Sequence, residues 1–95
     1  MINRIEYVSK FMNQPVAILC PRYTYSGIVS EIIEDYGIVL SNAFAIEQTG
    51  APTNEMPSIY TSIPSDGFIA FEAIEFIFQP VWCFGLMKLA KGNKK

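Results

Sequence analysis

The stretch from Tyr23 to Glu47, YTYSGIVSEIIEDYGIVLSNAFAIE, decides the fold of this 95-residue chain. It is rich in β-branched and aromatic residues, which suit a pleated and half-buried surface. Gly27 lacks a Cβ and lets a strongly bent sheet fold over itself. Residues 34–37 (EDYG) interrupt the apolar pattern. We therefore expect two long strands that meet at a sharp corner there.

The residues before this stretch predict a short helix. One helical face carries Ile5, Val8 and Met12, at the spacing of an amphipathic helix. Pro15 ends the helix, because proline disfavours a helical conformation in the residue before it. The helix is predicted over about residues 3–13, packed over an open end of the strands.

Further strands are predicted between about residues 16 and 79. Residues 48–57 are rich in turn formers and form the clearest loop. A strand candidate follows at residues 58–63, and residues 68–77 form a further apolar segment. The turn-forming residues 64–67 (PSDG) separate these two segments. The sequence leaves open whether they join two paired strands or form a bulge within one bent strand.

The segment after the last predicted strand is an apolar extension, residues 80–87. It could cover the sheet, mediate assembly or accept a protein partner at Val81–Met87. Leaving such an apolar surface bare would invite association, because its burial is favourable. We predict one domain over residues 1–88 and a flexible, lysine-rich tail over residues 89–95.

The distribution of charge is more informative than the net charge of −2. Between Phe11 and Met87 the only basic residue is Arg22, and it faces eight acidic residues, so this central body sums to −7. The other basic residues lie towards the chain ends. Any attraction for nucleic acid must therefore come mainly from the termini.

Enzymatic chemistry has little support. The chain has no histidine that could serve as a base, no glycine-rich phosphate loop and no zinc-type cysteine spacing. Cys20 and Cys83 have apolar surroundings and are interpreted as small buried hydrophobes. Five acids could either bind a divalent ion or stay in water, and the second interpretation is favoured: Glu31, Glu34, Asp35, Glu72 and Glu75. We predict no enzyme activity, cofactor or metal site.

The sequence also bears on location. No run approaches the roughly 20 apolar residues of a membrane helix. Charged residues near the N-terminus interrupt the apolar core that a secretory signal would need. The expectation is a cytoplasmic protein that does not insert into a membrane.

Two motifs stand out. The first is Gly27-x-Val29-x-x-Ile32 followed, after the corner, by residues 38–43 (IVLSNA). The second is formed by the apolar positions of residues 68–77. These motifs resemble those of the Sm-like (LSm) family, which includes bacterial Hfq. The resemblance implies an all-β fold with one short N-terminal helix and a small, strongly bent, five-stranded antiparallel Sm-like (SH3-like) barrel. It also implies a homo-oligomeric ring closed by edge-strand pairing, and binding of single-stranded RNA.

The resemblance further implies a set of RNA-binding residues. Aligned through Gly27, Tyr36 takes the base-stacking position and Gly37 the position of an asparagine. The acidic position falls on Ile33, so Asp35 or Glu34 would replace it only if the corner shifts its register. In the second motif Phe71 could stack on a base. The implied site is Asp35, Tyr36, Gly37, Phe71 and Glu72.

Two functions remain open from the sequence. The favoured one is binding of single-stranded RNA, with the lysine-rich tail adding non-specific attraction. The other is a structural or protein-interaction ring that keeps the fold without the usual RNA site. The acidic body, the missing side-chain amide at Gly37 and the apolar segment Val81–Met87 motivate the second, which is the alternative to RNA binding. A further stacking platform at Tyr23 and Tyr25 is possible, although packing is the commoner role of aromatic residues in strands.

Overall fold

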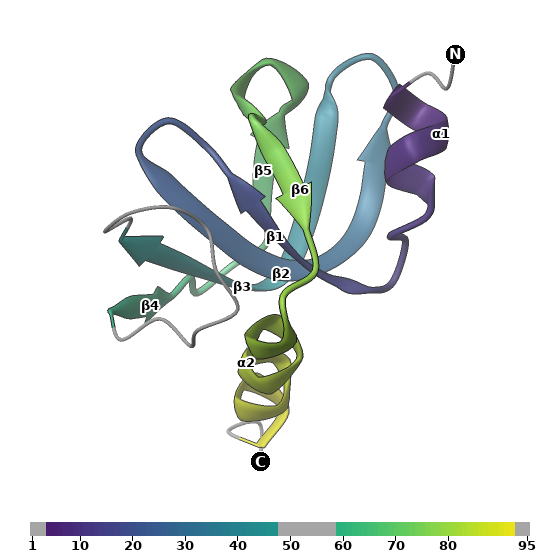
Figure 1. Ribbon diagram of the computed structural model, residues 1–95. Coiled ribbons are helices and arrows are strands. Elements are labelled where there is room, and N and C mark those ends of the chain that lie inside the picture. Colours follow the sequence, from purple (N-terminus) through teal and green to yellow (C-terminus); the bar gives the residue numbers. More distant parts are fainter. Residues whose placement is uncertain (1–3, 48–58, 93–95) are drawn as a thin grey trace.

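The computed structural model describes residues 4–47 and 59–92 and shows a bent antiparallel sheet with one helix at each end (Figure 1). The elements follow the chain in the order α1 (Arg4–Ser9), β1 (Pro15–Leu19), β2 (Tyr23–Ile33), β3 (Gly37–Glu47), β4 (Tyr60–Ser62), β5 (Gly67–Ala70), the 3₁₀ helix η1 (Phe71–Ala73), β6 (Phe76–Phe78) and α2 (Val81–Gly92).

The long hairpin of β2 and β3 is the centre of the sheet. Its strands meet at the corner expected from residues 34–37, so this prediction is confirmed. Pairing of β2 with β3 shifts register on both sides of Ile28 and Val29, which marks the bend in the sheet. At Gly27 an added Cβ would lie 3.0 Å from the Ser41 carbonyl oxygen. The absence of a Cβ therefore allows the close approach of the two strands.

The strand order is β4-β3-β2-β1-β6, and β5 pairs with β3 beside β4. Both β4 and β5 are thus partners of the same strand, which settles the question about residues 64–67. Phe44 pairs with Ser62 in β4, whereas Gly37 pairs with Ala70 in β5. The PSDG segment therefore lies between two strands, β4 and β5, that pair with successive parts of β3 and not with each other. The described chain therefore has six strands where five were predicted, because Pro64 breaks the path.

The N-terminal helix α1 ends at Ser9, earlier than the predicted range of about 3–13. The N–H groups of Lys10, Phe11 and Met12 each donate to the carbonyl three residues earlier, which tightens the chain into turns. Asn13 then adopts a positive φ of 63°, a conformation that a helix cannot continue. The helix still closes one side of the bent sheet through Val8, which is buried.

The main hydrophobic core lies inside the bend of the sheet. It combines one residue of α1 with inward-facing residues of β1, β2, β3, β5 and η1, and with Cys20, which follows β1. The buried members are Val8, Val16, Ile18, Cys20, Val29, Ile38, Leu40, Ala43, Ile69 and Phe71.

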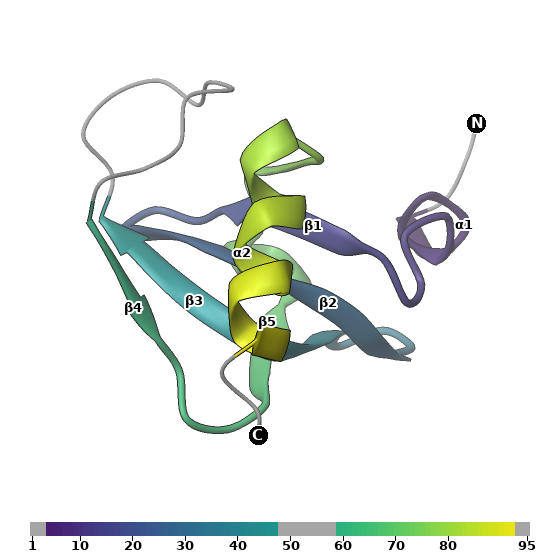
Figure 2. The same ribbon diagram turned by 90° about the horizontal axis from the view of Figure 1, so that it is seen from below.

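The C-terminal helix α2 is a correction to the fold class, which was predicted with one N-terminal helix only. It lies across the other face of the sheet (Figure 2). Trp82, Cys83, Leu86 and Met87 are buried there against Ala17, Phe44 and Ile46. The apolar extension thus covers the sheet of its own chain.

The helix also reaches into the range predicted as a tail. It continues to Gly92, within residues 89–95, and residues 93–95 lie outside the described residues. Within residues 4–47 and 59–92, no helix has the length and apolar character needed to cross a membrane.

Candidate functional site

The structure brings together the turns of the two resembling motifs. The Phe71 N–H donates a hydrogen bond to the Tyr36 carbonyl oxygen, with an N···O distance of 2.9 Å. In the adjacent ladder Gly37 pairs with Ala70. The corner between β2 and β3 therefore lies against the start of η1. We call this region, residues 34–37 and 71–73, the corner site.

Tyr36 is the most accessible aromatic residue of the corner site. Its side chain is 68% exposed, and its N–H donates to the Ile33 carbonyl oxygen across the turn. Asp35 precedes it with a positive φ of 71° and is also exposed. The turn thus presents a flat ring with a carboxylate beside it. Such a ring is available for stacking on a nucleobase or for contact with an apolar partner.

Gly37 is buried where β3 passes β5. An added Cβ would lie 2.1 Å from the Ile69 carbonyl oxygen and 2.9 Å from the Ala70 Cα. Both are backbone atoms, so the close approach of the two strands fills the space that a side chain would need. No side-chain amide can occupy this position without separating β3 from β5.

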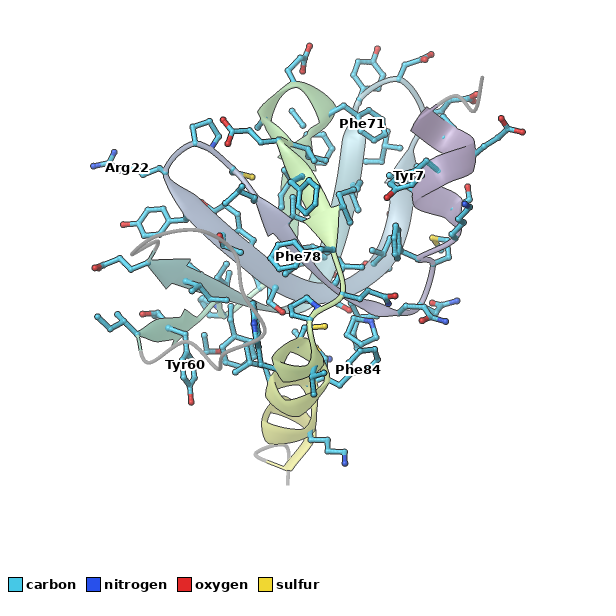
Figure 3. All side chains as sticks on the ribbon, viewed as in Figure 1. Tyr7, Arg22, Tyr60, Phe71, Phe78 and Phe84 are labelled. Atoms are coloured by element: carbon cyan, nitrogen blue, oxygen red, sulfur yellow. The ribbon has the colours of Figure 1, made fainter. Side chains whose placement is uncertain are left out.

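Phe71 lies in the core rather than on the surface. Its side chain is 8% exposed and belongs to the same cluster as Val8 and Ile69 (Figure 3). Stacking on a base would require the ring to leave this core. Glu72, the next residue in η1, is exposed. The predicted site residues are therefore brought together by the backbone, but only Tyr36, Asp35 and Glu72 face the solvent.

The electrostatics of the corner site are unfavourable for phosphate. Glu34, Asp35 and Glu72 are all exposed. No lysine or arginine occurs in residues 31–39 or 67–76, which form the strands and turns around it. A phosphate backbone would meet carboxylates there, without the basic side chains that usually position it.

A first pocket, of about 390 Å³, opens between the β1–β2 turn and β5. Its walls are mainly apolar and include Tyr23, Tyr25 and Phe68. The two tyrosine ring centroids lie 6.1 Å apart. Arg22 is its charged lining residue, but its side chain points away from the molecule (Figure 3). The pocket itself thus offers apolar surface rather than an anion site.

A second depression, of about 320 Å³, lies between α1 and the segment η1–β6. We call it the α1–β6 groove. It is lined by Tyr7, Val8, Phe71, Ile74, Glu75, Phe76 and Ile77. Sequence reasoning missed it because its walls come from segments almost 70 residues apart. Tyr7 falls within the predicted helix, and Phe76 falls within residues 68–77 of the second motif.

Both cysteines are buried thiols that form no disulfide, which confirms their interpretation as buried hydrophobes. Burial raises the pKa of the Cys20 thiol above its usual value, with a further increase from the Glu75 carboxylate. Burial also raises the pKa of Cys83 to about 11. Both thiols are therefore protonated at neutral pH, the form that is a poor nucleophile.

In the part of the chain that the structure describes, no group of three or more His, Cys, Asp or Glu side chains could hold a metal ion.

No protein-family model matches the chain, and comparison with curated proteins gives no match.

Proposed function

We propose that this protein is an Sm-like assembly module whose surface binds protein partners, and that it does not read RNA bases at the corner site. In this proposal the bent sheet is an open Sm-like barrel whose free strand edges pair with further copies in a homo-oligomeric ring. A cytoplasmic location and the lack of enzyme activity belong to the same proposal.

The observation that carries the proposal is the packing at Gly37. The β5 backbone fills the space that a base-reading side chain would occupy, and Phe71 contributes its ring to the core instead of the surface. Two of the implied RNA contacts are thus used for packing within the chain. The remaining corner surface is one exposed ring surrounded by carboxylates, which suits a protein partner better than phosphate.

Assembly is supported by the free edges of the sheet. Among the described strands, β4 and β6 end the strand order and β5 pairs only with β3. Exposed strand edges favour pairing with another chain, and ring closure removes such edges. Light scattering over a range of concentrations should therefore give a particle several times the 10.7 kDa of one chain. A mass of one chain at every concentration would contradict the proposal.

RNA binding is the second candidate function, and the exposure of Tyr36 favours it. The ring is 68% exposed at the junction of the two motif turns. If RNA stacks there, Tyr36→Ala should weaken binding by about 1–3 kcal/mol, the usual contribution of one base–aromatic stack. Fluorescence anisotropy with labelled RNA measures this effect, and Tyr60→Ala, which removes an exposed ring from β4, serves as the control. Equal affinities of the Tyr36 variant and the wild type would exclude the assignment.

A further inference from the structure

The α1–β6 groove combines exposed aromatic rings with one carboxylate. Tyr7 is 44% exposed on α1 and Phe76 is 55% exposed on β6. We propose that this groove binds a lysine or arginine side chain of a basic peptide. The inference rests on the proposed interaction function, since it names the chemistry of the partner. At about 320 Å³ the groove has the size of a small ligand pocket, which usually starts near 300 Å³.

The aromatic rings suit a cation because the face of a ring carries partial negative charge. The chain already uses Tyr7 in this way, since the Lys10 Nζ lies 5.5 Å from the centroid of its ring. Phe76 lines the same groove, and its ring contacts that of Phe78 at a centroid distance of 5.6 Å. A long cationic side chain entering the groove would therefore meet the Phe76 ring and would share the Tyr7 ring with Lys10.

The floor of the groove suits the aliphatic part of the same side chain. Ile74 and Ile77 are partly buried against the core and line the groove together with buried Val8. Lysine and arginine pack their methylene groups on apolar surface while the charged end stays near water or a partner. The apolar floor can contact the methylene groups, and the Glu75 carboxylate can pair with the charged end.

The charge of the groove decides between a cation and an anion. Glu75 is the one charged residue among those lining it, and its side chain is exposed. Lys10 places one positive charge at the α1 side of the groove, whereas Glu75 places a negative charge on the β6 side, in a body where eight acids outnumber one base between Phe11 and Met87. A negative surface concentrates cations and repels anions, so a basic peptide is favoured and a nucleic-acid backbone is not.

Binding of fluorescein-labelled hexalysine to the full chain at physiological salt tests this proposal, with labelled hexaglutamate as the peptide control. Tyr7→Leu, Phe76→Leu and Glu75→Gln should each weaken hexalysine binding about threefold to tenfold. Phe68→Leu and Glu31→Gln are matched controls, since Phe68 is 53% exposed outside the groove and Glu31 is an exposed acid of β2. These controls should stay within about twofold of the wild type.

Three results would overturn the inference. Equal losses in Glu75→Gln and Glu31→Gln would indicate attraction by the general negative field alone. A lower particle mass in Phe76→Leu would assign the groove to contact between copies of this chain. Absence of hexalysine binding by a particle that still assembles would reject the basic partner and leave the proposed assembly intact. A single-chain mass, in contrast, would reject the proposed assembly whatever the peptide result.

Discussion

Gly37→Asn should destabilise the protein by at least about 3 kcal/mol, the upper part of the range for overpacking a well-packed interior. The first atom of the new side chain would lie 2.1 Å from the Ile69 carbonyl oxygen. A flexible side chain could move aside, but this obstacle is backbone. Relief of the contact requires β5 to move away from β3, which breaks the pairing of the two strands over four residue pairs, from Gly37–Ala70 to Leu40–Gly67.

The matched control for this prediction is Gly67→Ala. Gly67 lies in the same ladder, but a Cβ there would have no atom within 4 Å. Its free energy of unfolding should stay within about 1 kcal/mol of the wild type. Urea unfolding of the three proteins measures the difference. A Gly37→Asn variant that unfolds at the wild-type midpoint would contradict the account of the corner site, because the position would then tolerate the amide that the resemblance implies for reading RNA.

Leu86→Ala should lower the free energy of unfolding by about 2–5 kcal/mol. Leu86 is fully buried between α2 and the sheet, in a cluster with Trp82, Phe44 and Ile46. Truncation leaves a cavity and removes contacts that fix α2 on the sheet. Domains of this size have a total stability of about 5–15 kcal/mol, so this one substitution would remove a large share of it.

Phe84→Ala is the control for α2, because Phe84 is 45% exposed on the same helix. Its cost should be within about 1 kcal/mol, as is usual for a surface position. The pair of variants separates two uses of the apolar extension, packing within the chain and capture of a partner. If Leu86→Ala costs no more than Phe84→Ala in chemical denaturation, the helix does not pack on the sheet as described.

The long hairpin could be predicted from the sequence because its signal is local. From Tyr23 to Glu47 the β-branched and aromatic residues specify strands, and residues 34–37 specify the corner. The path after the loop was predicted in outline for the same reason. The effect of the PSDG segment on pairing could not be deduced, since it depends on β3 as the common partner.

The helix α2 was not predicted because its sequence is ambiguous. Val81, Trp82, Phe84 and Gly85 do not favour a helix strongly, and a short apolar run fits a buried strand equally well. The buried positions 82, 83, 86 and 87 follow a helical spacing that becomes clear only with the sheet face in view.

The candidate site shows the same limit. Tyr36 could be expected at an exposed corner, because the turn residues around it are polar. The burial of Phe71 could not be expected, because the register of the preceding strand decides whether a following side chain faces the core or the solvent. The α1–β6 groove depends on the docking of α1 beside β6, which brings Tyr7 near Phe76. Local pattern carries no information on such a contact.

The measurement that tests the central claim most directly is fluorescence anisotropy with short labelled RNAs, uridine-rich, adenosine-rich and mixed, at low and at physiological salt. An assembly module without a base-reading site should bind all three RNAs weakly and with similar affinity. This binding should disappear as the salt concentration rises, because only non-specific attraction to the lysine-rich end remains. Tight binding of one sequence that persists at physiological salt, and is lost in Tyr36→Ala, would contradict the account and establish the corner site as an RNA site.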